Sequence, residues 1–177
     1  MKNKLLKTRT LGLAMAAVLA TGSFFDTSAT AATATANLQV TATIAGSCSI
    51  TTSPVAFGTI PTNGSMVSAN GSVNVTCSSG TTAVVTLDEG LNRIPGSSSL
   101  ASPYRQMKHN SADSTLSYSL AVDSAGIMPF GNHVGGLNTI TSTGAEQSVI
   151  VYGFATSSSS TLVPGSYSDT VVATVTY

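Results

Sequence analysis

STLSYSLAVD, residues 114–123, alternates between apolar and polar side chains over most of its length. In an extended chain, successive side chains point to opposite faces, so a period of two places one set in a core and the other in solvent. The run therefore predicts a β-strand with one buried face. Its inward side chains are Leu116, Tyr118, Leu120 and Val122, and its outward ones are Ser117, Ser119 and Ala121.

Short runs of the same kind recur on both sides of this segment, separated by clusters of Gly, Pro, Asn and Ser. We expect strands within 36–50, 53–60, 71–77, 81–88, 104–108, 146–154 and 167–177, and loops over most of 89–113, 124–145 and 155–166. Outside the first 32 residues, no stretch repeats apolar residues at the spacing of a helix. Many short strands with turn residues between them predict an all-β sandwich.

The N-terminal 32 residues have the composition of a secretory signal peptide. Lys2, Lys4, Lys7 and Arg9 precede an apolar run over 11–25, and small residues follow it. This order predicts a signal peptide over 1–32, with cleavage after Ala32 or, alternatively, after Ala36. The residues that follow, about 145, are enough for one domain with a core, and no later run is long enough to span a bilayer.

The charge of the exported part excludes one large class of partner. After residue 32 the chain has three basic and six acidic residues, a net charge of −3. Because each phosphate contact needs a cation, so few basic side chains predict no binding to nucleic acid.

The exported part has two cysteines, Cys48 and Cys77. An even number of cysteines in an oxidising compartment favours a disulfide between them. The alternative is a metal-binding pair, but two thiolates without clustered histidines make a poor zinc site.

Few residues offer chemistry for catalysis. His109 and His133 fall in expected loops, and the adjacent Asp88 and Glu89 are expected in a solvated turn. No Gly-x-Ser-x-Gly turn and no phosphate-binding glycine loop occurs. We therefore expect no enzyme activity, no catalytic residues, no metal site and no cofactor.

Several segments, in their order, resemble the spore coat protein U domain family, which includes pilins of the archaic, Csu-type chaperone–usher pathway. Three of these segments are the most specific. They are Cys48 and Cys77 with a Phe-Gly pair between them in the sequence, Tyr-x-Leu-x-x-Asp at 118–123, and Pro-Gly-x-Tyr-x-Asp at 164–169. Phe130 stands where many relatives have tryptophan. The resemblance covers nearly the whole exported chain.

The resemblance implies an immunoglobulin-like antiparallel sandwich that lacks its last strand and is completed by a donated strand. A periplasmic chaperone first lends this strand, and an outer-membrane usher exchanges it for the N-terminal extension of another copy or a related pilin. The extension would be 33–46 and the domain 47–177. The donor side chains would be Leu38, Val40, Ala42 and Ile44, and the chaperone-contacting ones Val171, Ala173, Val175 and Tyr177, with the Tyr177 carboxylate in the chaperone cleft.

The function implied is that of a structural subunit of a surface pilus, exported through the periplasm and supporting adhesion and biofilm formation. Three alternatives stay open at this point. Residues 37–44 could be an ordinary first strand of a closed sandwich, and the protein could be a spore or cell-surface coat protein without a pilus. It could also be a tip adhesin whose loops touch a surface through Ile94, Leu100, Ile127 and Met128.

Overall fold

The computed structural model describes residues 31–96, 101, 103–131, 138–157 and 162–177, and the chain divides into two units, Met1–Thr41 and Ala42–Tyr177. Residues 1–30 of the expected signal peptide lie outside the described residues. In the first unit, residues 31–41 form no strand, and Leu38 and Val40 are exposed. The strand expected within 36–50 begins only at Cys48 in the second unit, and residues 42–47 before it form no strand.

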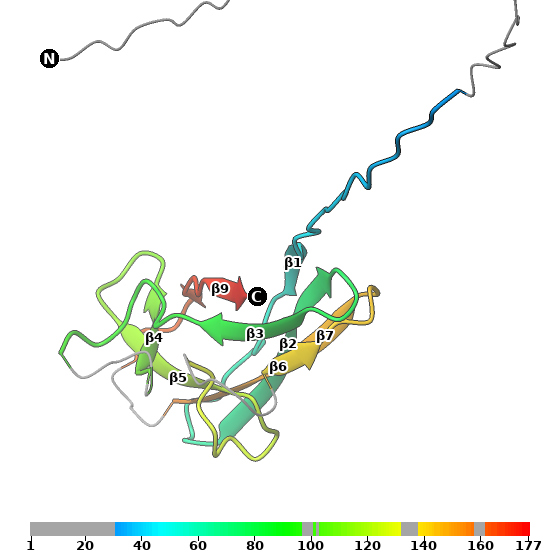
Figure 1. Ribbon diagram of the computed structural model, residues 1–177. Helices are drawn as coiled ribbons and strands as arrows, with labels where there is room; N and C mark the ends of the chain where they lie inside the picture. Colours follow the sequence, from blue (N-terminus) through cyan, green and yellow to red (C-terminus); the bar gives the residue numbers. More distant parts are fainter. Residues whose placement is uncertain (1–30, 97–100, 102, 132–137, 158–161) are drawn as a thin grey trace, which may run out of the picture. The chain divides into compact units, whose positions relative to one another are not determined.

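The described residues of the second unit form nine strands and no helix (Figure 1). The strands are β1 Cys48–Ser53, β2 Met66–Cys77, β3 Thr82–Leu87, β4 Arg105–His109, β5 Thr115–Ala121, β6 Thr139–Thr141, β7 Gln147–Thr156, β8 Tyr167–Ser168 and β9 Ala173–Thr176. No helix long and apolar enough to cross a membrane occurs in the described part of the chain.

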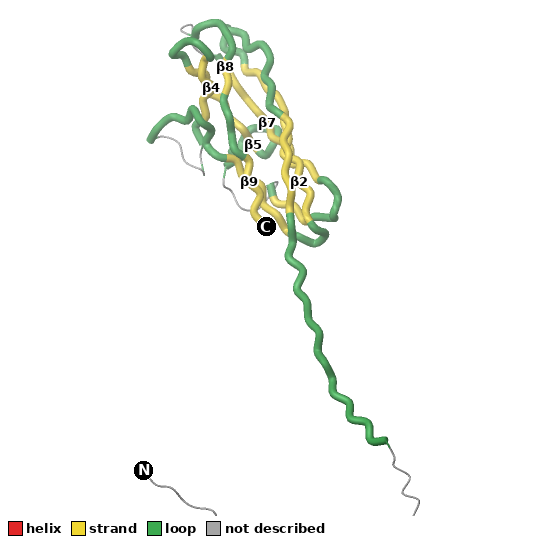
Figure 2. Tube along the Cα trace, turned by 90° about the horizontal axis from the view of Figure 1, so that it is seen from above, coloured by secondary structure: helices red, strands yellow, loops and turns green. Residues whose placement is uncertain are grey.

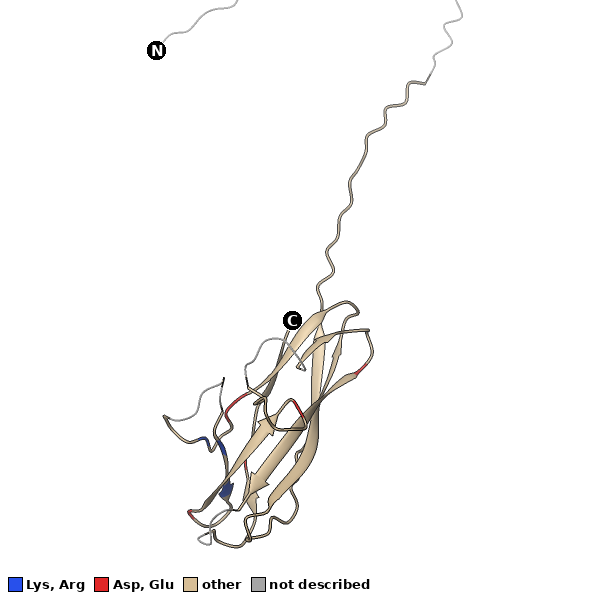
Figure 3. Ribbon diagram, turned by 90° about the horizontal axis from the view of Figure 1, so that it is seen from below, with Lys and Arg blue, Asp and Glu red and all other residues tan. Residues whose placement is uncertain are grey.

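The strands form two antiparallel sheets that face each other (Figure 2). The large sheet has the order β1-β2-β7-β5-β4-β8, and the small sheet has the order β6-β3-β9. The predicted all-β sandwich is therefore confirmed. Figure 3 shows how few charged residues the described ribbon has.

The core lies between the sheets and is built from alternate residues of their strands. It includes Val73, Val75 and Cys77 of β2, Val149 and Val151 of β7, Leu120 of β5, and Ala83, Val85 and Leu87 of β3. In the segment that opened the sequence analysis, Leu116, Leu120 and Val122 are buried, Tyr118 is half-buried, and Ser117 and Ser119 are exposed, as predicted.

Ala121, which was expected to face outward, is buried, so that prediction is wrong. The turn after β5 folds back over the outer face, where a Cβ added to Gly126 would lie 2.9 Å from the ring of Phe154, the partner of Ser119 in β7. Ala121 forms an isolated bridge with Pro129, and the amide of Phe130 donates to the carbonyl of Leu120 at 2.8 Å. A turn that covers the outer face of a strand removes the solvent that the alternation assumed.

Two strand predictions and one loop prediction also differ from the structure. The expected strand 53–60 ends at Ser53, because Pro54 has no amide to donate and 54–60 has no paired neighbour. The short β6 lies in the expected loop 124–145. The expected strand 167–177 is split into β8 and β9, which belong to different sheets.

The predicted disulfide joins Cys48 to Cys77. These residues face each other in the register of β1 and β2, at the start of one strand and the end of the other. The bridge therefore ties the edge strand β1 to the body of the large sheet.

Candidate functional site

β9 has an open edge. It lies at the end of the small sheet and is paired with β3, where Thr174 faces Thr86 and Thr176 faces Val84. The amide of Asp88 donates to the carbonyl of Val172 at 3.0 Å, so the even-numbered residues turn their backbone groups toward β3. In an antiparallel ladder the residues between them face the other way. The backbone groups of Ala173 and Val175 are therefore presented to a further strand.

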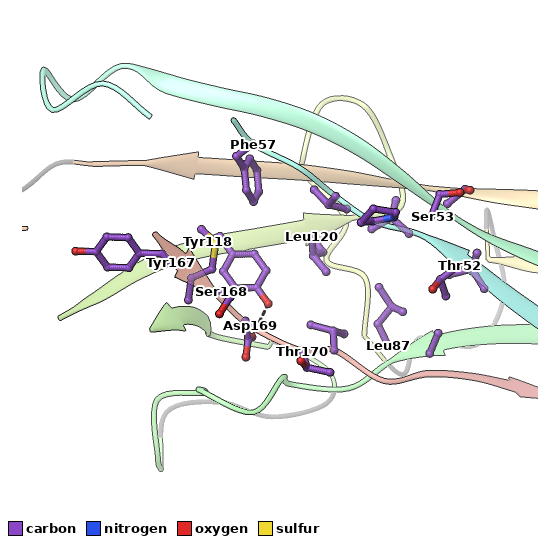
Figure 4. A pocket seen from close by; sticks show the side chains of 18 residues that line it. Thr52, Ser53, Phe57, Leu87, Tyr118, Leu120, Tyr167, Ser168, Asp169 and Thr170 are labelled. Atoms are coloured by element: carbon purple, nitrogen blue, oxygen red, sulfur yellow. Dashed lines mark hydrogen bonds between the residues drawn. The ribbon is translucent and has the colours of Figure 1, made fainter. Parts of the chain in front are cut away.

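A groove begins at the start of this edge, where Ala173 of β9 lines it. Its first part is a hollow of about 480 Å³, shown in Figure 4, between residues 52–57 on one side and residues 167–171 and Ala173 on the other. A second hollow of about 640 Å³ shares Val55, Phe57, Met107 and Tyr167 with the first and continues to Ile60 and residues 162–166. Together they form a continuous groove between the end of β1 and the C-terminal segment.

The lining of the first hollow is mostly apolar. Side chains of both sheets and of the two walls contribute to it: Val55, Phe57, Val73, Leu87, Leu120, Val151, Val171 and Ala173. Gly71 and Gly153 let the wall formed by 54–57 pack closely on the large sheet. A Cβ added to Gly71 would lie 2.8 Å from Val55 Cγ2, and one added to Gly153 would lie 2.5 Å from Val55 Cγ1.

A polar cluster borders the apolar lining where the C-terminal segment leaves β8. The Tyr118 hydroxyl donates a hydrogen bond to Asp169 Oδ2 at 2.6 Å. Asn92 donates two hydrogen bonds to Asp169 Oδ1, one from its backbone N–H at 3.2 Å and one from its side-chain Nδ2 at 3.0 Å. Burial, followed by the hydrogen bond to the Asp169 carboxylate, raises the pKa of Tyr118 well above its ordinary value. The phenol is therefore a hydrogen-bond donor at any physiological pH.

Asp88 does not lie in a freely solvated turn, as was expected. It is half-buried, and its Oδ1 accepts hydrogen bonds from the amides of Gly90 at 3.0 Å and Val172 at 2.9 Å. Glu89 is also half-buried and forms an ion pair with Arg93, with Oε2 3.5 Å from Nε. These carboxylates hold the chain in place and are not arranged for acid–base chemistry.

Arg105 is a buried cation that the sequence analysis did not identify. Its side chain is 1% exposed and donates to the carbonyl oxygens of Leu87, Asp88 and Phe130. Burial lowers the pKa of Arg105, while the nearby Tyr118 and the acidic residues oppose that change. Because Arg105 belongs to β4 and Leu87 to β3, the side chain joins the two sheets beside the groove. The sequence contained one signal that could have identified Arg105: it is an arginine in a predicted strand of a chain that has few charged residues.

His109 was expected in a loop, but it is the last residue of β4 and is buried. Its Nδ1 accepts hydrogen bonds from the amides of Ser111 and Ala112 at 3.0 and 2.9 Å, and its Nε2 lies 3.3 Å from the carbonyl oxygen of Pro164. The ring also packs edge-on against Tyr167, with 5.0 Å between centroids. These contacts give His109 a structural role at one end of the groove. His133 lies outside the described residues.

Replacing His109 by Ala should lower the free energy of unfolding by about 1–3 kcal/mol, because two backbone amides lose their acceptor. His109→Asn should recover part of this loss, since its side-chain oxygen can accept the same amides. Denaturant unfolding measures both variants. A His109→Ala protein as stable as the wild type would contradict the assigned contacts. We expect the double variant His109→Ala, His133→Ala still to assemble, because neither residue is assigned a chemical role.

The other site residues named from the sequence fall into two groups. The four expected donor side chains lie on a segment without strand structure, with Leu38 and Val40 in the first unit and Ala42 and Ile44 in the second, and all four are exposed. Val171, Ala173 and Val175 are half-buried against the core, whereas Tyr177 is 60% exposed.

The loop residues considered for surface contact also differ among themselves. Ile127 and Met128 are exposed on a turn whose amides donate to the Asp123 carboxylate at 3.2 and 2.7 Å. Ile94 is half-buried, and Leu100 lies outside the described residues. Among the described residues, no group of three or more His, Cys, Asp or Glu side chains is placed to hold a metal ion.

Comparison with known proteins agrees with this geometry. The family model for the spore coat protein U domain matches residues 34–174. Protein U of Myxococcus xanthus is 38% identical over 176 residues, which cover 93% of this chain and 97% of that protein.

Two solved structures have similar folds. One is a chain of the CsuC–CsuE chaperone–tip adhesion subunit pre-assembly complex from the archaic chaperone–usher Csu pili of Acinetobacter baumannii. Its TM-score is 0.53 and its identity 25%, over 76% of this chain and 40% of that chain. The other is the P pilus rod subunit PapA, with a TM-score of 0.50 and 16% identity, over 73% of this chain and 98% of that chain, a likeness of fold alone. The predicted immunoglobulin-like, pilin-type sandwich is confirmed.

Proposed function

Since the chain belongs to the spore coat protein U domain family, we propose that it is a structural subunit of a chaperone–usher pilus and polymerises by donor-strand exchange. The single observation that carries this proposal is the groove beside the open edge of β9. The solved relatives are pilus subunits, which are structural proteins, and this agrees with the prediction that the chain is not an enzyme.

The groove has the two features that a strand-binding site needs. The backbone groups of Ala173 and Val175 offer main-chain hydrogen bonds, and the apolar lining offers space for every second side chain of an added strand. In strand addition the main chain supplies affinity, and the pockets for alternate side chains supply specificity. The exposed edge of β9 would no longer be unpaired.

The N-terminal segment of another copy is the occupant that fits these features. Residues 37–44 contain no charge, and every second residue is apolar: Leu38, Val40, Ala42 and Ile44. Leu38, Val40 and Ile44 are 88%, 85% and 94% exposed in the single chain. Burying such a side chain contributes roughly 1.5–3 kcal/mol, so the segment gains stability by entering an apolar groove.

Before assembly, the same edge would be covered by a strand from a periplasmic chaperone, which an outer-membrane usher then exchanges. The similarity to a chain of a chaperone–subunit complex supports a chaperone as partner. In this arrangement Val171, Ala173 and Val175 line the contact, and the Tyr177 carboxylate binds in the chaperone cleft. The assembled fibre would be displayed at the cell surface, where it would support adhesion and biofilm formation.

A second function is favoured by a specific observation. Protein U of Myxococcus xanthus matches this chain over nearly the whole length of both proteins, and the family model is named for the spore coat protein U domain. A spore or cell-surface coat built from the same domain is therefore the alternative to a pilus. A tip adhesin is less well supported, because the chain covers only 40% of the matched chain in the complex that contains a tip adhesion subunit.

The experiment that tests the proposal compares the full chain with a variant lacking residues 33–44, each expressed with a chaperone and an usher. We expect the full chain to appear as thin fibres in electron micrographs. We expect the deletion variant to fold, to bind the chaperone one-to-one and to form no fibres. Fibres made by the deletion variant would contradict donor-strand exchange, and a full chain found only in an amorphous layer would favour the coat.

A further inference from the structure

The C-terminal segment changes sheets along one wall of the groove. β8 ends at Ser168 in the large sheet, and β9 begins at Ala173 in the small sheet. Residues 169–172 between them belong to neither strand, and residues 169–171 line the groove. The position of β9, and with it the open edge, therefore depends on how residues 169–172 are held.

This crossover is held by groups from two separate parts of the chain, β5 and residues 88–92. The Tyr118 hydroxyl of β5 and the amide and side chain of Asn92 bind the Asp169 carboxylate, as Figure 4 shows for Tyr118. The Asp88 carboxylate binds the amide of Val172 at 2.9 Å, and the amide of Leu91 donates to the carbonyl of Thr170 at 3.1 Å. Each of the residues 169, 170 and 172 thus has a hydrogen bond to a part of the chain that is distant in sequence.

The fit around the Asp169 carboxylate is close. A Cβ added to Gly90 would lie 2.2 Å from Asp169 Oδ2, and Gly90 has a φ of +77°. A side chain at position 90 would therefore displace the carboxylate and also be strained in its backbone. Beneath this region the buried Arg105 guanidinium binds the carbonyls of Leu87 and Asp88. The end of β3, to which β9 is paired, is thus held by Arg105.

We propose that Tyr118, Asp169, Asn92 and Asp88, here called the clasp, are positioning residues that keep the crossover in place and the β9 edge preformed before a strand arrives. This role rests on the proposed function. Ordering a loop at the moment of binding reduces affinity, so a site that is already ordered binds its strand faster and more tightly. A bond to an ionised carboxylate is well suited to this, because it is stronger than a bond between neutral groups.

Tyr118→Phe removes one hydroxyl and keeps the ring that packs against Phe57 at 6.2 Å between centroids. Asp169→Ala removes the acceptor, and Asp169→Asn retains one carbonyl oxygen that can accept. Ser142→Ala is the matched control. It also removes a buried hydroxyl, which donates to the carbonyl of Cys77 at 2.7 Å, but Ser142 does not line either hollow.

Hydrogen exchange on the full chain tests the clasp without any added strand. We expect Tyr118→Phe and Asp169→Ala to speed exchange of the amides of residues 172, 174 and 176, which face β3 and Asp88, by at least about tenfold, a change of about 1.4 kcal/mol. Asp169→Asn should give a smaller change, and Ser142→Ala should leave these amides unchanged. Equal exchange of the amides of residues 172, 174 and 176 in Tyr118→Phe and the wild type would overturn the proposal.

Uptake of a labelled peptide with the sequence of residues 36–47 tests the consequence for strand binding. We expect the two clasp variants to take up the peptide about tenfold more slowly than the wild type, and Ser142→Ala to bind at the wild-type rate. Slowing in Ser142→Ala equal to that in the clasp variants would overturn the positioning role. If the wild type takes up no peptide while exchange responds as expected, the clasp stands and the proposed function fails.

Discussion

Replacing Val40 or Ile44 by Asp should abolish polymer formation while the domain still folds. In the proposed fibre each of these side chains enters the groove of another copy, whose lining includes Val73, Leu120 and Val151. A carboxylate placed there would lose its water without gaining a cation, which is far more costly than the loss of one apolar contact. Electron microscopy of fibres and separation of undissociated polymers on a gel measure the effect.

Thr41→Asp is the matched control, because residue 41 lies on the opposite face of the same extended segment. It introduces the same charge and should leave most polymer intact. The altered subunits should still bind a chaperone through the C-terminal edge. Equal loss of polymer in Val40→Asp and Thr41→Asp would mean that the charge itself, and not its position in the groove, is responsible.

Loss of the disulfide should produce the largest change in stability. Replacing Cys48 or Cys77 by Ser should lower the free energy of unfolding by about 2–5 kcal/mol, the usual effect of removing a native bridge from a small exported domain. The bridge joins residues 29 apart and fixes β1 at the edge of the large sheet. β1 continues directly into residues 52–57, which form one side of the groove. We therefore expect this side of the groove to become less stable together with the edge strand.

Denaturant unfolding of the purified protein measures this effect, with and without a reducing agent. Reduction should destabilise the wild type by a similar amount and leave the Cys48→Ser, Cys77→Ser double variant unchanged. Alkylation of the unreduced protein should label neither cysteine. A double variant as stable as the oxidised wild type would show that the bridge does not support the fold.

The fold was largely predictable from local pattern. Alternation identified the strand containing Leu116 and Leu120, and the two cysteines gave the correct bridge. The strand prediction succeeded because a strand with one buried face has an apolar residue at every second position. Ala121 was misplaced because a later turn covers it, and no pattern within its own strand records that turn.

The candidate site was predictable in part. Of the C-terminal residues named from the sequence, Val171 and Ala173 line the first hollow. The split between β8 and β9 was not predicted, because a single alternating run does not show where a chain changes sheets. The contacts of Arg105 and the pairing of Tyr118 with Asp169 were also missed. These groups lie far apart in the sequence, 51 residues in the case of Tyr118 and Asp169, so only the tertiary fold brings them together.

Photo-crosslinking from residue 40 tests the central claim most directly. A photoreactive amino acid is placed at position 40, or at position 41 as control, in fibres assembled from equal amounts of light and heavy isotope-labelled subunits. We predict that position 40 reacts with groove-lining residues such as Leu120, Val151 and Ala173, and that the crosslinked peptides include light–heavy pairs, which come from two different copies. Crosslinks from position 40 that are confined to one copy, or that reach only the outer face of the large sheet, would contradict strand donation between subunits.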